Sequence, residues 1–286
     1  MTTTLLAVPN FSEGQDRSAI DAIAGAFAAP VLDIHSDRDH HRSVFTLAGP
    51  PGGLAQAVVA GTREAMNRID VGAHEGVHPR VGALDVAPIV YLGERDRGAA
   101  CAEALVLADL LGSELQLPVF IYGQLAGGRT RAELRRGGPA NLGARLERGE
   151  LSPDFGPRHL HESAGATLVA ARPPLVAFNV ELGHSATLED AKVIAARIRE
   201  GGPEGLRGVR AIGLWLTETR TAQVSTNVED HLATPLRAVV DAVRNHAAVA
   251  GTELVGLAPR AAFDTFPEDV PVRNKRILED IVGTLN

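Results

Sequence analysis

The 286-residue sequence is poor in several features that would point to particular classes of protein. It has one cysteine, Cys101, so no internal disulfide can form, which favours a reducing compartment and a cytoplasmic location. Its longest apolar run, Ala22–Leu32, is shorter than the roughly 18 residues of a membrane span, and its N-terminal segment lacks the features of a signal peptide. We therefore expect neither membrane insertion nor secretion.

Concentrated positive charge is also lacking. The net charge is −7, aromatic residues make up 4% of the chain, and there is no long run of Lys and Arg. A nucleic-acid surface needs clustered positive charge, so we expect no nucleic-acid partner and favour a small molecule. The hydrophobic content of 45% over this length is enough for at least one large core.

Hydrophobic periodicity predicts two halves with one order of elements. The first half is predicted to contain strands at Leu5–Pro9, Val31–His35, Ser43–Ala48, Ala83–Leu92 and Pro118–Tyr122 and helices at Ser18–Ala28, Gly53–Ile69 and Arg97–Leu115. The second half is predicted to contain strands at Thr167–Ala171, Leu175–Leu182, Val209–Thr217, Gln223–Val228 and Glu253–Leu257 and helices at Ser185–Arg199 and Pro235–Val249. Both halves therefore have a βαββαβ order, without a repeat in the sequence itself.

Between the halves lies the segment 127–165, which is rich in glycine, proline and arginine. Its composition suits a connector with short helical pieces, and we expect the domain boundary here. Connectors between domains commonly line ligand sites, but composition alone favours a solvated linker.

The stretch GAHEGVHPRVGALD at 72–85 places His74 and His78 four residues apart. Residues 74–78, HEGVH, match the zinc-protease pattern HExxH, in which a continuous helix brings both histidines to one ion. Gly76 lies inside that turn and Pro79 follows it, so a regular helix is not expected. We therefore predict no metal, and a metallohydrolase is only a third alternative.

Proton transfer is the remaining chemistry for His78. Its loop precedes the strand predicted at Ala83–Leu92, and an imidazole pKa near ~6.5 suits a base at neutral pH. Arg80 is a candidate for binding a carboxylate. The alternative is structural, with His78 bonded to backbone and Arg80 in a surface ion pair, and a single histidine does not decide between them.

Six blocks spread over the chain carry more information than this loop alone. Together they resemble the glutamate formiminotransferase family, over about residues 7 to 258: VPNFSEG at 8–14, DHHRSVFTLAGPP at 39–51, HEGVHPRVGALDVAP at 74–88, SPDFGP at 152–157, AGATLVAARPPLVAFNVEL at 164–182 and QVSTNVED at 223–230. The resemblance implies an α/β (α+β) fold of two ferredoxin-like βαββαβ subdomains with the ligand site between them. The N-terminal subdomain with the catalytic histidine and the connector would occupy residues 1–165, and the C-terminal subdomain residues 166–286. With no room for a cyclodeaminase domain, the chain resembles a stand-alone transferase.

The resemblance also implies a reaction. A formimino group would pass from N-formimino-L-glutamate to N5 of tetrahydrofolate, a co-substrate, giving 5-formiminotetrahydrofolate and glutamate. The family's catalytic histidine falls on His78, the general base. Its folate-binding loop falls on Gly156, Pro157, Arg158, His159, Leu160, His161, Glu162, Ser163, Ala164 and Gly165. Folate and formiminoglutamate are thus the expected partners, and a homodimer is an open option.

Further side chains are candidates for binding the two substrates. Both substrates carry carboxylates, so a protein of net charge −7 needs local positive charge, and Arg42, Arg80, Arg158 and Arg172 are candidates. Asn10 and Asp85 could orient amidine or pterin nitrogens. The structural alternatives are surface ion pairs for the arginines, a turn for Asn10 and a strand-edge hydrogen bond for Asp85.

The sequence departs from the family pattern near the histidine. His35 stands where an acidic residue is expected, His41 where asparagine is expected, and the family's HxGEHPR appears as HEGVHPR, with Val77 in place of Glu. His40 and His41 could also form a solvated loop. These departures keep two alternatives open, namely a non-catalytic folate-binding or regulatory relative and a formyl-transferring variant.

The departure at His35 generates a first prediction. A carboxylate beside His78 raises its pKa, whereas a neutral His35 orients the ring without adding charge. We expect the limb of the kcat/KM profile set by His78 to lie at lower pH in the wild type than in His35→Glu. The profiles of the wild type and His35→Glu could instead superimpose, while the limb moves in Asp33→Asn, Asp37→Asn or Asp39→Asn. That result would make the aspartate concerned, and not residue 35, the partner of His78. Transfer seen only in His35→Glu would favour the non-catalytic alternative.

Overall fold

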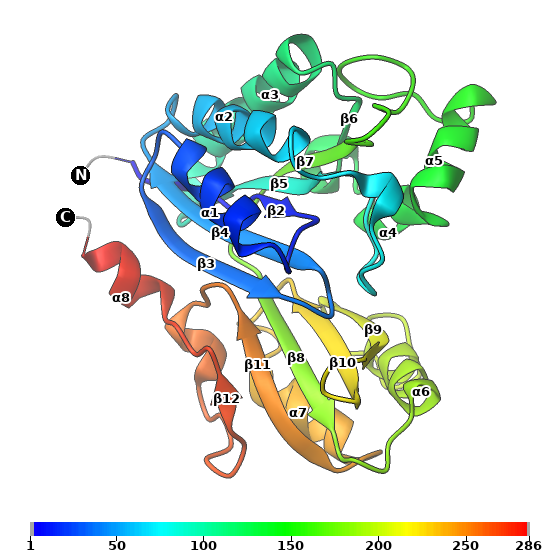
Figure 1. The fold of residues 1–286 in the computed structure, drawn as a ribbon. Helices are drawn as coiled ribbons and strands as arrows, with labels where there is room; N and C mark the ends of the chain where they lie inside the picture. The colour runs from blue at the N-terminus through cyan, green and yellow to red at the C-terminus, as the bar shows by residue number, and fades with distance from the viewer. Residues whose placement is uncertain (1–2, 285–286) are drawn as a thin grey trace. The chain divides into compact units, whose positions relative to one another are not determined.

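The structure is a computed structural model that describes residues 3–284. The chain divides into two compact units, with the break between Pro173 and Pro174. Each unit contains one β-sheet with helices packed on it (Figure 1).

The first unit contains all the helices and strands predicted for the first half of the chain. Its strands are β1 (Leu5–Ala7), β2 (Asn10–Phe11), β3 (Val31–Asp37), β4 (Arg42–Gly49), β5 (Leu84–Tyr91), β6 (Val119–Ile121) and β7 (Thr167–Arg172). Its helices are α1 (Arg17–Ala26), α2 (Leu54–Met66), α3 (Arg97–Glu114), α4 (Arg131–Arg135) and α5 (Gly138–Glu147). The last two helices come from the predicted connector.

The first sheet has a ferredoxin-like part and an extension. β1 and β2 together act as one strand, because both pair antiparallel with β4 and with β5, while β3 pairs with β4. Counting β1 and β2 as the first strand, the spatial order is fourth, first, third, second, which confirms the predicted ferredoxin-like βαββαβ order. Beyond β5 the sheet continues in parallel through β7 to β6.

The strand predicted at Thr167–Ala171 forms as β7, but it belongs to the first sheet, whereas the predicted element order placed it in the second half. It lies between β5 and β6, and its residues from Thr167 to Ala171 are buried. A strand covered on both faces is a continuous apolar run, which carries no information about which sheet it joins.

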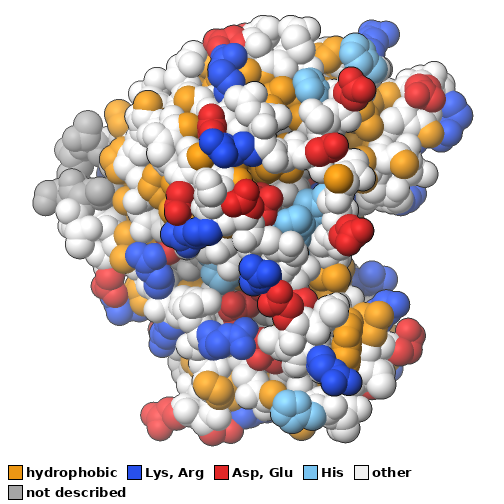
Figure 2. All heavy atoms as spheres, in the orientation of Figure 1, with side chains coloured by type: hydrophobic (Ala, Val, Ile, Leu, Met, Phe, Trp, Pro, Cys, Tyr) orange, Lys and Arg blue, Asp and Glu red, His pale blue; other side chains and the backbone are white. Residues whose placement is uncertain are grey.

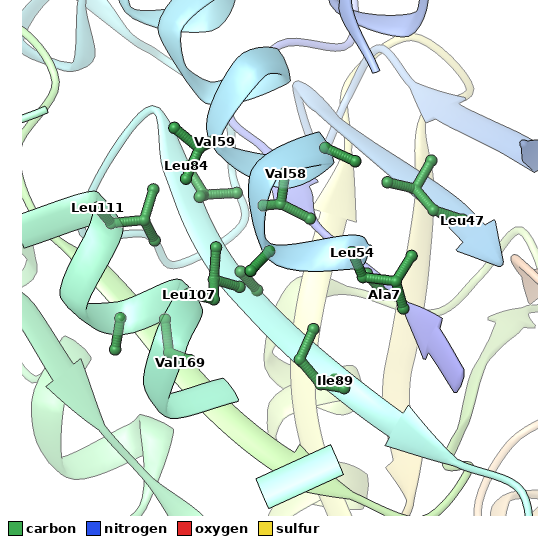
Figure 3. Close-up of a cluster of buried hydrophobic side chains, with 14 of the residues drawn as sticks. Ala7, Leu47, Leu54, Val58, Val59, Leu84, Ile89, Leu107, Leu111 and Val169 are labelled. Atoms are coloured by element: carbon green, nitrogen blue, oxygen red, sulfur yellow. The ribbon is translucent and has the colours of Figure 1, made fainter. Parts of the chain in front are cut away.

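Apolar helix faces cover one face of the first sheet and, at β5, β6 and β7, the other face as well. Helices α1, α2 and α3 pack on one face, and Figure 3 shows part of this core, where Leu54 and Val58 of α2 and Leu107 of α3 pack with Ile89 of β5. On the other face, a second cluster joins side chains of β5, β6 and β7 to Leu134 of α4 and to leucines of α5. The segment 127–165 is therefore a folded part of the first unit rather than a solvated linker.

The second unit repeats the ferredoxin-like order. It contains strands β8 (Val176–Leu182), β9 (Val209–Leu216), β10 (Thr221–Val228), β11 (Val249–Val255) and β12 (Val272–Arg273) and helices α6 (Leu188–Ile198), α7 (Leu236–Arg244) and α8 (Leu278–Gly283). The sheet order is β12-β11-β8-β10-β9, and an apolar core includes side chains of α6 and α7. The fold is thus α+β with two subdomains. β12 and α8 are additions that periodicity did not predict, because β12 is too short to show an alternation.

Two surface features bear on partners. Within residues 3–284, none of the helices is long and apolar enough to cross a membrane. On the face shown in Figure 2, basic and acidic side chains are interspersed rather than gathered into one basic patch.

One tertiary contact in the first unit completes a helix terminus. Helix α2 has glycine at its N-cap and no side-chain cap of its own. The carboxylate of Glu103, on α3, is 4% exposed and accepts hydrogen bonds from the backbone N–H groups of Leu54 at 2.9 Å and Ala55 at 2.7 Å. The first N–H groups of a helix have no partner within the helix, and the Glu103 carboxylate accepts hydrogen bonds from them. Its negative charge also interacts favourably with the helix N-terminus.

We expect Glu103→Gln to destabilise the fold by about 1–3 kcal/mol, because the amide removes the negative charge at the helix N-terminus and places an NH2 group where Oε2 accepts from the Gly52 N–H. Equilibrium urea unfolding followed by circular dichroism measures the change. Glu114→Gln is the matched control, since Glu114 is an exposed residue on the same helix, and we expect it to shift stability by less than about 0.5 kcal/mol. Equal effects of the two substitutions would show that the cap contributes nothing specific.

Candidate functional site

The loop that carries His78, residues 74–81, leads into β5 and fixes the tautomer of this histidine. Nδ1 of His78 lies 2.8 Å from the carbonyl oxygen of Pro79. A carbonyl oxygen only accepts, so Nδ1 carries the proton and donates it, and Nε2 keeps its lone pair. This tautomer is the one that a base acting through Nε2 requires. The His78 side chain is also partly exposed.

The surroundings of His78 disfavour its protonated form. Its pKa lies well below the usual value because of desolvation and then because of the positive charges of Arg42 and Arg135, with His40 adding to the effect. The His40 ring lies 5.8 Å from the His78 ring, centroid to centroid. His78 is therefore neutral at pH 7, and its imidazolium form would give up a proton readily.

The Arg80 side chain donates hydrogen bonds to backbone carbonyls of the His78 loop, to which it belongs. Its Nη1 donates to the carbonyl oxygen of Gly76 at 2.9 Å, and its Nη2 donates to that of His74. The predicted alternatives were carboxylate binding and a surface ion pair. In the structure the guanidinium instead satisfies backbone carbonyls of its own loop, which a chain broken by Gly76 and Pro79 cannot pair through a regular helix.

His74 is held by backbone on both sides of its ring. Nε2 lies 2.8 Å from the carbonyl oxygen of His41 and therefore donates, while Nδ1 accepts from the Gly76 N–H at 3.0 Å. Burial is the largest of the effects that lower the pKa of His74 to about 4. Both ring nitrogens of His74 are thus engaged by backbone groups.

Two further histidines, His40 and His41, lie next to the His78 loop. His40 is buried, and His41 stacks on His74 with ring centroids 4.1 Å apart. Nε2 of His41 also lies 3.1 Å from a carboxylate oxygen of Glu13. The interpretation of His40 and His41 as a solvated loop is therefore wrong. Across residues 3–284, no group of three or more His, Cys, Asp and Glu side chains is arranged to hold a metal ion.

The Asp85 carboxylate accepts hydrogen bonds from three different segments of the first unit. Asp85 lies on β5 and is fully buried. Its Oδ2 accepts from Arg42 at 2.6 Å and from Arg135, while its Oδ1 accepts from the Val81 N–H at 2.9 Å. Although burial opposes ionisation, Arg135 and Arg42 hold the pKa of Asp85 below its usual value. Both oxygens are engaged within the protein, so Asp85 acts on the site through these partners.

Asn10 extends this network to a second strand of the sheet. Its Oδ1 accepts from Nε of Arg42 at 3.1 Å, and its Nδ2 donates to the carbonyl oxygen of Val8 at 2.7 Å. Asn10 therefore orients Arg42, which in turn binds Asp85.

Arg135 is the member of the network that sequence reasoning missed. It ends α4, the short helix of the predicted connector, whose N-terminus is closed by a capping box between Thr130 and Glu133. The letters TRAE at 130–133 are the sequence signature of such a helix start. That signal indicated order in a segment whose composition favoured a solvated linker.

The predicted folate loop, 156–165, ends in a tight hairpin next to the His78 loop. The backbones of His161 and Gly165 bond to each other in both directions, at 3.0 and 2.9 Å. The carbonyl oxygen of Ala164 accepts from the Ala83 N–H at 2.9 Å. A Cβ added at Gly82 would lie 1.9 Å from the carbonyl oxygen of Ala166, so only glycine permits this approach. Two blocks some 80 residues apart in the sequence thus meet at one place.

The remaining predicted residues lie on the same unit. Arg158, His159 and Glu162 are exposed on the 156–165 segment. His35 is buried on β3, opposite Val44. Arg172 ends β7, where its Nη1 donates to the carbonyl oxygen of Pro173 at 2.9 Å.

Comparison with known protein families decides the classification. Residues 4–172 match the family model of the formiminotransferase domain, N-terminal subdomain, and residues 177–268 match that of the formiminotransferase domain. The chain belongs to the formiminotransferase family. Within this family, His78 and the 156–165 hairpin both lie in the part that matches the N-terminal subdomain.

Curated relatives of the formiminotransferase family align with nearly the whole chain. A glutamate formimidoyltransferase of Streptococcus pyogenes is 35% identical over 92% of this chain and 91% of its own length. One from Thermoplasma acidophilum is 35% identical, over 90% of this chain and 88% of its own length. A formimidoyltransferase-cyclodeaminase of Rattus norvegicus is 37% identical over 92% of this chain. The chain spans 51% of that longer relative.

The low pKa of His74 gives a prediction for stability against pH. Above pH 6.5, His74 is neutral in both the folded and the unfolded chain and contributes nothing. As pH falls from 6.5 towards about 4, only the unfolded chain takes up this proton, so stability is lost in that window. We expect His74→Gln, which keeps one donor and one acceptor, to lose less stability between pH 7 and pH 4.5 than the wild type.

Urea midpoints at several pH values measure this difference. His184→Gln is the matched control, because His184 is exposed, and it should follow the wild-type pH dependence. A His74→Gln curve parallel to that of the wild type would contradict the assigned role.

Proposed function

We propose that this protein transfers the formimino group of N-formimino-L-glutamate to N5 of tetrahydrofolate, with His78 as general base. The observation that carries the proposal is the state of His78. Nδ1 donates to the Pro79 carbonyl oxygen, Nε2 keeps its lone pair, and the imidazole is neutral at pH 7. Membership of the formiminotransferase family supports this choice of substrates.

The chemistry needs one proton to be moved twice. When N5 attacks the amidine carbon, the new C–N bond leaves N5 positively charged, and Nε2 of His78 takes its proton as the tetrahedral intermediate forms. The C–N bond to glutamate then breaks, and the imidazolium returns the proton to the departing glutamate nitrogen. The cations Arg42 and Arg135 disfavour the imidazolium, so they make the second transfer easier once the first has occurred. No bond between protein and substrate is required.

Substrate binding is assigned to the 156–165 hairpin and its surroundings. Gly156 and Gly165 face neighbouring backbone, because added Cβ atoms there would lie 2.1 Å from the carbonyl oxygen of Leu117 and 2.3 Å from that of Val81. They therefore shape the 156–165 hairpin, and its exposed side chains are the surface open to a pterin. Arg158 is exposed on it and suits a substrate carboxylate. Arg42 and Arg80 are committed to Asp85 and to loop carbonyls, so their part in the reaction is to organise the site. Holding two substrates in contact supplies much of the remaining rate.

The departure at His35 supports a second candidate, a non-catalytic folate-binding relative. In the usual arrangement of a catalytic histidine, a side-chain carboxylate fixes the tautomer, and His35 cannot supply one. Here the carbonyl of Pro79 supplies the acceptor for Nδ1. Because that acceptor is backbone, the tautomer of His78 needs no side-chain carboxylate, which favours the active enzyme.

We expect His78→Ala to lower kcat by about 10²–10⁴ while folate affinity changes little. The assay mixes purified protein with formiminoglutamate and tetrahydrofolate and follows the absorbance of the folate product. His184→Ala, which removes an exposed histidine, is the matched control and should keep wild-type turnover.

Undiminished turnover in His78→Ala would remove this residue from the mechanism. Folate binding by the wild type without turnover at any pH would favour the non-catalytic relative. Replacing the donor by N-formylglutamate in the same assay separates formimino from formyl transfer.

A further inference from the structure

Helix α4 is a five-residue segment set between two pairs of glycines. Gly127 and Gly128 precede it with φ of 61° and 92°, and Gly137 and Gly138 follow it with φ of 75° and 70°. All four adopt left-handed backbone that other residues rarely tolerate. The chain thus turns sharply on both sides of α4, and it places the side chains of this short helix by tertiary contacts rather than by helix length.

Those contacts include one that reaches the site. Leu134 is buried in the apolar cluster under β5, β6 and β7, and the adjacent Arg135 points its guanidinium at Asp85. Arg135 has 11% of its side chain exposed and Asp85 has none. Arg42 binds the same carboxylate from β4. Two guanidinium groups and one carboxylate leave a surplus of one positive charge.

We propose that Arg135 is a positioning residue for the transfer reaction, acting on His78 through the carboxylate of Asp85 that it shares with Arg42. The inference rests on the proposed function. Arg42 and Arg135 both donate to Oδ2 of this carboxylate. Its Oδ1 accepts from Nε of Arg135 at 3.4 Å and from the N–H of Val81, where the His78 loop ends. The position of α4 is thereby tied to the position of the loop.

Electrostatics gives the same residue a second effect. The charged and titratable groups that act on His78 are His40 from the preceding turn, Arg42 from β4 and Arg135 from α4. Arg80 belongs to the same loop and binds its carbonyls. Without Arg135, the charge of Arg42 is balanced by Asp85 alone, the positive surplus disappears, and His78 takes up a proton more readily.

The first experiment compares pH profiles of kcat/KM for the wild type, Arg135→Gln, Arg135→Lys and Arg136→Gln. Arg136 is the matched control, because it is the adjacent arginine and is exposed. We expect the limb set by His78 to move to higher pH in Arg135→Gln, by about one pH unit as for loss of one nearby charge. Arg135→Lys keeps the charge and should lie between Arg135→Gln and the wild type. Arg136→Gln should match the wild type.

The second experiment measures His78 without the reaction. The pKa of its ring is followed by NMR in protein with labelled histidine, and His78→Gln identifies its signal. We expect this pKa to rise in Arg135→Gln, to be partly restored in Arg135→Lys and to be unchanged in Arg136→Gln. Because no substrate is present, the result holds even where the transferase assay fails.

The outcomes separate the two claims. Inactive wild type with a shifted His78 titration in Arg135→Gln would contradict the proposed function and keep the coupling between Arg135 and His78. Active wild type with the same limb and the same titration in Arg135→Gln as in Arg136→Gln would overturn the inference. Loss of activity in Arg135→Gln at every pH, without a shift of the limb or of the titration, would also overturn it, since it would indicate a purely structural role.

Discussion

A single fully buried carboxylate, that of Asp85, organises the first unit around its site. A charge taken out of water is costly unless it is paired and hydrogen-bonded. Asp85 is paired with Arg42 from β4 and Arg135 from α4, and it also accepts from the backbone at Val81. Because each partner comes from a different segment, the requirement to neutralise one carboxylate fixes where a strand, a helix and the His78 loop lie.

The same network sets the state of His78, the proposed base, without a side-chain carboxylate bound to its ring. Such a carboxylate fixes the tautomer of a histidine and raises its pKa. Here the Pro79 carbonyl oxygen fixes the tautomer, while the cations around Asp85 lower the pKa. The result is a ring that is oriented but neutral, which suits a proton acceptor whose proton must later be returned. A single carboxylate would set both the orientation and the charge state of the ring. Here the Pro79 carbonyl oxygen sets the orientation, and the nearby arginines favour the neutral state.

The extension of the first sheet brings the predicted folate-binding segment next to the His78 loop. After α3 the chain forms β6, passes through α4 and α5, and returns as β7 between β5 and β6. This return carries the 156–165 hairpin to the end of the His78 loop, where Gly82 and Gly165 permit two backbones to approach closely. The predicted connector is therefore a folded part of the first unit, and it contacts both the His78 loop and Asp85.

The sequence by itself determined the order of the elements and the character of the His78 loop. Periodicity reports whether a residue is buried, so it located the strands and helices of both ferredoxin-like subdomains. Gly76 and Pro79 excluded a helix and with it the zinc-protease geometry. Tertiary structure alone decided that β7 joins the first sheet and that Arg135 meets Asp85, fifty residues away in the chain. Local patterns record burial and not the identity of a distant partner, and a buried charge acquires its partner only when the chain has folded.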